Sequence, residues 1–198
     1  MEKHKNSAGW TEAGYNLFAR EGLDGIQVER LARILQLNKS GFYHYFGDLE
    51  GFCLELLELH KKKIDDFVEE VYGIKKLDPD YLHLVISHAK TVMFQVQLIR
   101  NSNSQFLYAA SEIADQKVQV AIRELWCDYL DVPRDTDLGM RYYTIVRDMF
   151  YTRISFQNLN YTFLHNMVTD AKSIMVEISD RGPVETIGPR FKTVDDAV

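Results

Sequence analysis

Apolar residues recur at helical spacing along almost the whole chain, and this periodicity constrains the fold more than any other feature. From residue 49 to 71, and again from 163 to 178, they repeat at intervals of three and four, which places them on one face of a helix. No segment alternates apolar and polar residues for long enough to predict a strand. The chain has 198 residues with only 4 Pro and 11 Gly, so few positions break a helix, and the sequence predicts an all-α fold.

Helix-terminating residues divide the chain into short helices followed by longer ones. Three short helices are expected, at residues 13–22, 28–35 and 38–45. Asp48 then caps a long helix that ends before Gly73. Longer helices are expected at residues 79–99, 114–129, 138–154 and 163–178, with a polar break at 101–104, a short helical turn at 106–110 and a loop at 131–135. Gly182 and Pro183 end the last helix.

Composition excludes several classes of protein. Hydrophobic residues make up 46% of the chain, which is too many for a disordered protein, yet no long uncharged apolar run could span a membrane. The N-terminal residues include no apolar stretch of the kind that a secretory signal needs. The two cysteines, Cys53 and Cys127, are too few for a disulfide framework and are interpreted as buried thiols in a reducing compartment. A cytoplasmic location is therefore expected.

The sequence carries no pattern typical of catalysis or metal binding. No nucleophile motif, phosphate-binding loop, zinc pattern or dinucleotide fingerprint occurs. His83 and His88 are five residues apart, so a helix does not place them on one face as a pair of metal ligands. We therefore expect no enzyme activity, no metal and no cofactor.

Three short helices with a tight turn between the second and third are the arrangement of a helix-turn-helix. Its apolar residues can close a small core, with Leu37 filling the gap at the turn: Phe18, Leu31, Leu35, Leu37, Phe42 and Phe46. Asn38 caps the third helix, whose exposed face then carries Lys39, Ser40, Gly41, Tyr43 and His44. Gly41 lets the backbone approach DNA closely. Lys39 can reach a phosphate or a guanine edge, whereas Tyr43 and His44 can bind phosphate oxygens.

The same region resembles the DNA-binding domain of the TetR family of transcriptional regulators. Residues 13–22 read AGYNLFAREG, residues 28–46 read VERLARILQLNKSGFYHYF, and GDLEGF follows. The residues that match the family pattern in register are Leu17, Phe18, Gly22, Val28, Leu31, Ala32, Leu37, Phe42, Tyr43, Tyr45, Phe46 and Glu50. The match covers residues 7–55, and the rest of the chain is compatible with the family through its helices alone.

This resemblance implies a ligand-responsive DNA-binding regulator, a repressor, that binds a pseudo-palindromic operator as a homodimer. It implies a helix-turn-helix DNA-binding domain at residues 1–47, a helical ligand-binding and dimerisation domain at 48–183, and an irregular tail at 184–198. The partners would be double-stranded DNA, a second copy of the chain and a small-molecule effector of unknown identity. The DNA contacts would come from Gln27, Val28, Arg33, Asn38, Lys39, Ser40, Gly41, Tyr43 and His44.

Three departures from the family pattern and a weak positive charge keep a second interpretation open. Gln27 replaces the usual Ser or Thr cap, a loss of about 1 kcal/mol. Leu49 replaces a phosphate-contacting Lys, although the N-terminus of that helix can still donate N–H groups to a phosphate. Gln36 replaces a Gly, and since a left-handed conformation costs a non-Gly residue about 1–2 kcal/mol, we expect a turn of another kind. Residues 1–47 hold six Lys and Arg and five Asp and Glu, a balance of +1 in a chain of net charge −6. The alternative is therefore a helical small-molecule sensor that keeps the fold with weak or no specific DNA binding.

The second half is rich in large, adaptable side chains at helical spacing, which either fill the core or enclose an apolar cavity. For the cavity we expect a lining of Met93, Val96, Phe106, Trp126, Tyr129, Tyr142, Ile145 and Met149, with Gln97 and Arg147 as its polar contacts. The last two helices are apolar on more than one side, because Phe156 and Val176 lie off the main stripes. Such helices need a second partner, so we expect a dimer joined through residues 138–154 and 163–178.

Overall fold

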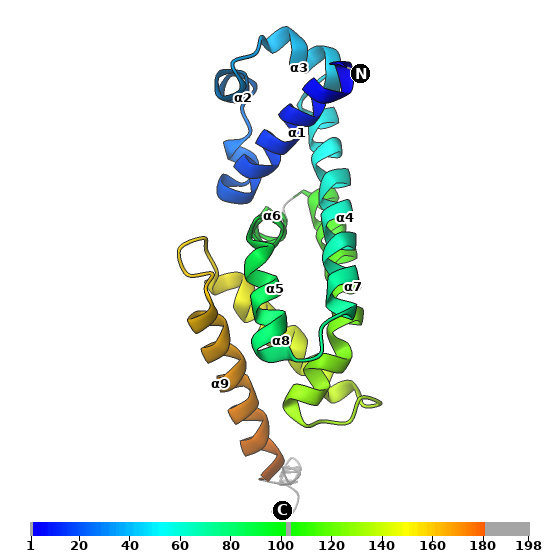
Figure 1. The fold of residues 1–198 in the computed structure, drawn as a ribbon, viewed down its shortest axis with the longest axis vertical. Helices are drawn as coiled ribbons and strands as arrows, with labels where there is room; N and C mark the ends of the chain where they lie inside the picture. Colours follow the sequence, from blue (N-terminus) through cyan, green and yellow to red (C-terminus); the bar gives the residue numbers. More distant parts are fainter. Residues whose placement is uncertain (1, 102–103, 181–198) are drawn as a thin grey trace, which may run out of the picture.

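The computed structural model describes residues 2–101 and 104–180, and all regular structure within these ranges is helical. In chain order the elements are α1 (Glu2–Glu21), η1 (Leu23–Gly25), α2 (Val28–Leu35), α3 (Lys39–Phe46), α4 (Leu49–Tyr72), η2 (Leu77–Tyr81), α5 (Leu82–Ser87), α6 (Ala89–Arg100), α7 (Gln105–Leu130), α8 (Asp137–Arg153) and α9 (Tyr161–Asp180). Figure 1 shows α1, α2 and α3 grouped at one end, while α4 runs from that end into the body beside α7. The prediction of an all-α fold is confirmed.

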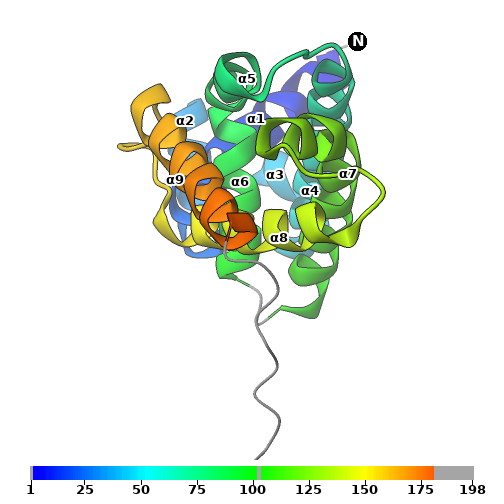
Figure 2. The ribbon, with the colours of Figure 1, turned by 90° about the horizontal axis from the view of Figure 1, so that it is seen from below.

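Helix α6 lies in the middle of the body, as Figure 2 shows. Six consecutive residues, from Met93 to Leu98, are buried, and a helix buried on all sides needs neighbours on all sides. Its neighbours are α1, α4, α5 and α7. The Phe94 ring stacks on Tyr15 at 4.2 Å between centroids and lies 4.3 Å from Phe18. Helix α1 therefore belongs both to the N-terminal helices and to the core of the body.

Aromatic rings close the core of the N-terminal helices. Phe42 of α3 lies 5.6 Å from Trp10 of α1 and 5.0 Å from Phe52 of α4, measured between ring centroids. Gly14 lets α1 cross α4 here, because a Cβ atom at this position would lie 2.3 Å from the Phe52 ring. The orientation of α3 is therefore fixed from the inside by packed rings.

Two helix boundaries differ from those that the sequence predicts. Helix α1 begins at Glu2, well before residue 13, and it buries Trp10, a lone aromatic ahead of the predicted stripe. The predicted helix at residues 79–99 is broken at His88, whose backbone leaves the helical region with φ −95° and ψ 26°. The bounds of α2, α3, α4 and α9 agree with the sequence to within a few residues.

A third difference concerns the middle of the chain. Residues 105–130 form the single helix α7 rather than a short turn followed by a helix. Its buried residues include the polar Ser111 and Asp115, which interrupt the apolar pattern without interrupting the helix. Residues 102–103 of the predicted polar break, the predicted helix end at 182–183 and the tail at 184–198 lie outside the described residues.

Three smaller predictions also need correction. Leu37 does not fill the core at the turn, since it is 39% exposed. Asn38 lies at the N-cap of α3, but its side chain makes no capping hydrogen bond. Cys127 is buried, whereas Cys53 is only half-buried, and both are free thiols. Among the described helices, none is both long and apolar enough to cross a membrane.

The turn between α2 and α3 is built on a left-handed residue. Gln36 has φ 56° and ψ 39°, and the N–H of the following Leu37 donates to the Ala32 carbonyl at 2.9 Å. This is the hydrogen-bond pattern with which a glycine usually ends a helix. The expectation of a turn of another kind is therefore wrong, and Gln36 adopts a conformation that is unfavourable for its side chain.

We predict that Gln36→Gly stabilises the protein by about 1 kcal/mol. Glycine avoids the penalty of about 1–2 kcal/mol that other residues incur here, and it loses part of that gain to its greater freedom in the unfolded chain. Chemical denaturation measures the change. Arg33→Gly, at an exposed position inside α2, is the matched control and should destabilise by about 1 kcal/mol. Equal destabilisation by both variants would contradict the strain assigned to Gln36.

Candidate functional site

Helix α3 presents one face to the core and one to solvent. Phe42 is fully buried on the inner face, whereas Lys39, Ser40, Tyr43 and His44 are exposed. These four polar side chains occupy the first and last turns of a two-turn helix. The outer face of α3 is therefore open to a partner along its whole length.

Gly41 lies in the middle of this helix without a packing reason for being glycine. Its φ is not positive, unlike those of Gly22 and Gly47. Apart from its chain neighbours and the backbone of α3, the nearest atom to a Cβ added at Gly41 is Cε2 of Tyr45, at 3.9 Å, which is an ordinary contact. An alanine would therefore fit the fold at this position.

Seven of the nine residues predicted to contact DNA are exposed: Gln27, Arg33, Asn38, Lys39, Ser40, Tyr43 and His44. Gly41 is half-buried. Val28 is a correction, because it is 8% exposed and belongs to the hydrophobic core. The helical periodicity of α2 places its side chain inward, so that side chain is not available to DNA.

Ion pairs within the N-terminal helices engage two of their cations. Lys39 Nζ lies 2.9 Å from Glu29 Oε1, and Arg30 Nη2 donates to Glu21 Oε1 at 2.6 Å. Exposed pairs of this kind stabilise a fold little. The hydrogen bond from Lys39 holds the pKa of Glu29 below its usual value. Lys39 must therefore leave Glu29 in order to contact a phosphate.

The N-terminus of α4 is already capped. The Asp48 carboxylate accepts a hydrogen bond from the Gly51 N–H at 2.8 Å, which confirms the predicted cap. Leu49, the first residue of α4, is exposed. A phosphate at this helix end would meet the negative charge of Asp48, so the end is a poorer phosphate site than its free N–H groups alone would make it.

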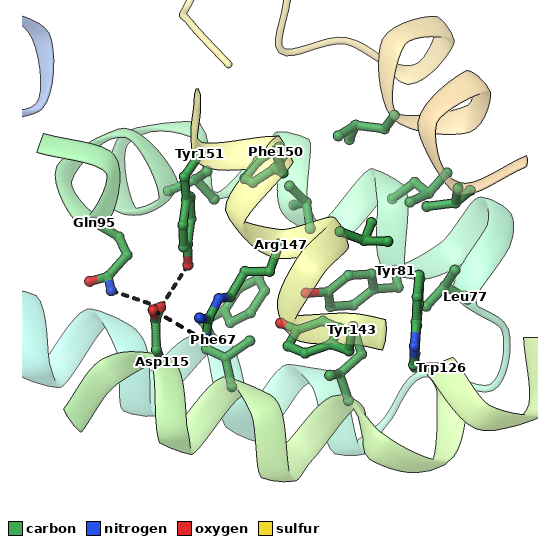
Figure 3. Close-up of a pocket in the computed structure, with 18 of the residues that line it drawn as sticks. Phe67, Leu77, Tyr81, Gln95, Asp115, Trp126, Tyr143, Arg147, Phe150 and Tyr151 are labelled. Carbon is green, nitrogen blue, oxygen red and sulfur yellow. Dashed lines mark hydrogen bonds and ion pairs between the residues drawn. The ribbon is translucent and has the colours of Figure 1, made fainter. Parts of the chain in front are cut away.

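The body contains a partly open cavity of about 110 Å³ between α4, α6, α7, α8, α9 and the η2–α5 segment (Figure 3). Apolar side chains make most of its wall. The polar side chains on the wall are Tyr81, Thr91, Gln95, Asp115, Tyr143, Arg147 and Tyr151. Figure 3 shows Gln95, Asp115, Arg147 and Tyr151 gathered at one end of the cavity and Trp126 at the other.

Two of the ten residues predicted to bind a ligand, Trp126 and Arg147, line this cavity. The other eight do not line it: Met93, Val96, Gln97, Phe106, Tyr129, Tyr142, Ile145 and Met149. Helix α8 is apolar on two faces, and the sequence pattern assigned Ile145 and Met149 to the inner one. Both are exposed, while Tyr143 faces the cavity.

Several of the predicted residues that do not line this cavity have other contacts. The Gln97 side chain donates to a backbone carbonyl of α1, and the Tyr142 hydroxyl donates to one of α9. Phe106 lies on a separate groove between α4 and α7. Met93 and Val96 are buried in the core. Periodicity placed these residues on the apolar faces of their helices. It does not predict which neighbouring helix each side chain contacts.

The sequence pattern indicated only Arg147 among the polar residues of the wall and not the other six: Tyr81, Thr91, Gln95, Asp115, Tyr143 and Tyr151. One signal was present. Asp115 stands beside Ala114 and three residues before Val118, on the apolar stripe of α7. A carboxylate on a buried stripe is unusual unless it is paired, so this position pointed to a buried polar site.

A continuous chain of buried hydrogen bonds links α1 to this polar wall. Tyr15 Oη of α1 lies 2.8 Å from His60 Nδ1 of α4, and His60 Nε2 lies 3.0 Å from Gln95 Oε1 of α6. Gln95 Nε2 donates to Asp115 Oδ1 of α7 at 2.8 Å, and the Tyr151 hydroxyl of α8 donates to the same oxygen at 2.6 Å. Five helices share this network, and its last three members line the cavity.

The donor and acceptor roles in this hydrogen-bond chain follow from Gln95, whose two side-chain groups can be assigned. Gln95 Nε2 donates both to Asp115 Oδ1 and to the Ser111 carbonyl, at 2.8 and 2.9 Å, so Gln95 Oε1 is the acceptor. A neutral His60 then carries its hydrogen on Nε2, and its Nδ1 accepts from the Tyr15 hydroxyl. Every donor from Tyr15 onward therefore points toward the Asp115 carboxylate.

An ion pair between Arg147 and Asp115 lies at the cavity end of the hydrogen-bond chain. Arg147 Nη1 lies 3.5 Å from Asp115 Oδ2, and Arg147 Nη2 donates to Asp148 Oδ1 at 2.9 Å. Burial raises the pKa of Asp115, while the hydrogen bonds from Tyr151 and Gln95 and the charge of Arg147 lower it. As an ion pair, Asp115 and Arg147 add no net charge to the cavity.

We predict that His60 makes the protein less stable in acid. It is 2% exposed, and burial lowers its pKa from 6.5 to about 4, with the charge of Lys63 adding to the effect. The unfolded chain therefore takes up this proton at a higher pH than the folded protein does. The contribution of His60 to stability is complete above pH 6.5 and falls as the pH drops toward 4. Between pH 6.5 and pH 4, protonation of His60 should lower the free energy of unfolding by about 3 kcal/mol.

The variant His60→Gln isolates this effect, because glutamine does not titrate and can hydrogen-bond within the same chain. Between neutral pH and pH 4, the free energy of unfolding of the parent should fall by about 3 kcal/mol more than that of the variant. Asp115, whose pKa is raised, acts in the opposite direction and in both proteins. Parallel pH profiles for parent and variant would contradict a neutral, buried His60.

Comparison with known proteins shows that the N-terminal helices are similar to a family of regulatory proteins. The family model for bacterial regulatory proteins of the tetR family matches residues 11–56. These residues run from the middle of α1 through α2 and α3 into α4. They include all nine residues predicted to contact DNA.

Two curated relatives from Staphylococcus aureus extend the similarity over different lengths. An HTH-type transcriptional regulator of strain MRSA252 is 23% identical over 167 residues, which cover 80% of this chain and 82% of that protein. Another HTH-type transcriptional regulator, of strain USA300, is 28% identical over 78 residues, which cover 36% of this chain and 42% of that protein. No solved structure gives a significant match to this chain.

Proposed function

We propose that this chain, whose residues 11–56 match the family model for bacterial regulatory proteins of the tetR family, is a ligand-responsive repressor that binds a pseudo-palindromic operator as a homodimer. The observation that carries the proposal is the outer face of α3, where exposed polar side chains surround a glycine that the fold does not need. Two such helices, one from each subunit, would enter successive major grooves about 34–36 Å apart. A DNA partner also implies a cytoplasmic location.

Gly41→Ala should separate DNA binding from stability. Alanine inside a helix is more favourable than glycine by about 0.5–1 kcal/mol, and the space at this position admits its methyl group. If the backbone of α3 approaches a base edge, the same methyl group should weaken operator binding by about tenfold, within the range for one lost base contact. Mobility-shift assays on operator fragments selected from genomic DNA, together with thermal denaturation, measure both quantities. A variant that is stabilised and binds DNA as well as the parent would show that α3 does not approach the bases.

The charge of Lys39 tests the same face in a second way. Lys39→Ala should weaken binding and flatten the slope of log affinity against log salt concentration by about 0.9, the effect of one phosphate contact. Glu29→Gln, which releases Lys39 from its ion pair, should strengthen binding instead. Tyr43→Ala, on the same exposed face, should weaken it. Unchanged binding in all three variants would favour the alternative function, a helical sensor without specific DNA binding.

The outer stripes of α8 and α9 supply the dimer interface in this proposal. Exposed apolar residues repeat there at helical spacing: Leu138, Ile145 and Met149 on α8, and Ile174 and Ile178 on α9. The Tyr142 hydroxyl of α8 donates to the Ala171 carbonyl of α9 at 3.0 Å, a direct contact between the two helices. Apolar stripes left in solvent mark association surfaces, and two helices from each subunit would form a four-helix interface.

Ile145→Glu and Ile174→Glu should each shift the protein from dimer to monomer and abolish operator binding at the same time. The two side chains are 57% and 48% exposed, so a charge at either position spares the core of the subunit. Val120→Glu, 68% exposed on α7, is the matched control and should leave the dimer intact. Sedimentation velocity at micromolar concentration measures the outcome. A monomeric parent, or a dimer that tolerates both charges, would rule out this interface.

The cavity and the hydrogen-bond chain support the ligand response. Asp115 and Tyr151 lie at the cavity end of the chain, and Tyr15 at its other end belongs to α1, which also carries Trp10 of the N-terminal core. A ligand that alters the hydrogen bonds of Asp115 changes what Gln95 and the groups beyond it can bond to. The proposed division of labour is that residues 1–47 read DNA and residues 48–183 bind the ligand and dimerise. The ligand shifts the position of α1 only as far as its affinities for the two states differ.

A further inference from the structure

The hydroxyls of two tyrosines on the cavity wall take no part in the hydrogen-bond chain. The hydroxyls of Tyr81 in η2 and Tyr143 in α8 belong to its wall, and in Figure 3 both point toward the side chain of Arg147. Within residues 2–101 and 104–180, neither hydroxyl has a hydrogen-bond partner. Burial raises the pKa of both tyrosines, so both hydroxyls are hydrogen-bond donors at neutral pH. They are two convergent donors on a wall that is mostly apolar.

The size of the cavity limits what these hydroxyls can bind. Its volume is about 110 Å³, somewhat less than the cavity of about 150 Å³ that binds benzene in another protein. A ligand of one ring or a short chain fits, and a larger one requires the helices to move apart. The rings of Phe67 and Trp126 supply the apolar surface for its body.

The charge of the wall limits the ligand further. Asp115 already accepts hydrogen bonds from Gln95 and Tyr151, and Arg147 lies beside its other oxygen. A ligand ammonium or carboxylate would add an uncompensated charge to this mostly apolar site, and burying such a charge is costly. The acceptor that suits two phenolic donors without adding charge is a carbonyl oxygen.

We propose that the effector is a small uncharged carbonyl compound, one ring or a short chain in size, whose oxygen accepts hydrogen bonds from the Tyr81 and Tyr143 hydroxyls. This inference rests on the proposed ligand response and names the chemistry of its ligand. The bound oxygen lies on the Arg147 side of the cavity, next to the end of the hydrogen-bond chain that leads to Tyr15.

Cyclohexanone and methylenecyclohexane test the proposal, because they have nearly the same shape and only the ketone carries an acceptor oxygen. Tyr81→Phe and Tyr143→Phe each remove one hydroxyl and keep the ring. Calorimetric titration should show that each variant binds cyclohexanone about fivefold more weakly than the parent, the effect of one neutral hydrogen bond. The affinity for methylenecyclohexane should stay the same. Tyr142→Phe, whose hydroxyl bonds to α9 away from the cavity, is the matched control and should leave both affinities unchanged.

Three results would overturn the proposal. The first is that the two variants weaken both probes equally or weaken neither. The second is that cyclohexanecarboxylate or cyclohexylammonium binds more tightly than cyclohexanone, which would show that the cavity prefers a charge. The third is that no probe binds. Melting temperatures equal to that of the parent show that the Tyr→Phe variants are folded.

Operator binding measured in the same solutions separates this inference from the proposed function. If cyclohexanone binds as predicted and leaves operator affinity unchanged, the chemistry of the cavity stands and the ligand response fails. If a charged molecule or one without a carbonyl group releases the operator, the ligand response stands and the carbonyl proposal fails.

Discussion

The buried hydrogen-bond chain from Tyr15 to Asp115 constrains how every other part of the structure can be arranged. Its members come from α1, α4, α6, α7 and α8, and polar groups buried among rings are costly unless each is paired. The observed packing of these helices brings all of them together. His60 stacks on Phe94 at 4.5 Å between centroids, and as a neutral imidazole it accepts on one side and donates on the other. Helix α1 of the N-terminal group and the helices around the cavity are therefore joined by one polar network.

Among the described residues, three places outside this network offer a surface whose chemistry suits one proposed partner. The ring core around Phe42 turns the outer face of α3 to solvent, and Gly41 keeps that face flat. The cavity leaves the hydroxyls of Tyr81 and Tyr143 without partners among the described residues. The outer sides of α8 and α9 leave apolar stripes in solvent. DNA, a carbonyl ligand and a second subunit are the partners that match these chemistries.

The sequence predicted the helices better than it predicted their faces. Caps and periodicity located α2, α3 and α4, because those signals are local. Helix α8 is apolar on two sides, and a single sequence does not say which side a neighbour covers, so Ile145 was placed inside and Tyr143 was overlooked. Asp115 and its partners were missed because a buried polar group is stable only through residues far away along the chain. At Gln36, packing of α2 against α3 overrode the local preference against a left-handed residue.

A double-mutant cycle between Tyr15→Phe and Tyr151→Phe tests most directly whether the two ends of the hydrogen-bond chain are energetically coupled. The two hydroxyls lie at opposite ends and are separated by His60, Gln95 and Asp115. Free energies of unfolding for the parent, the two single variants and the double variant should reveal a coupling of about 0.5 kcal/mol or more, as expected for members of one hydrogen-bond network. Tyr142→Phe combined with Tyr15→Phe should be additive. If the Tyr15 and Tyr151 effects are also additive to within about 0.3 kcal/mol, the cavity and α1 are not coupled through this chain.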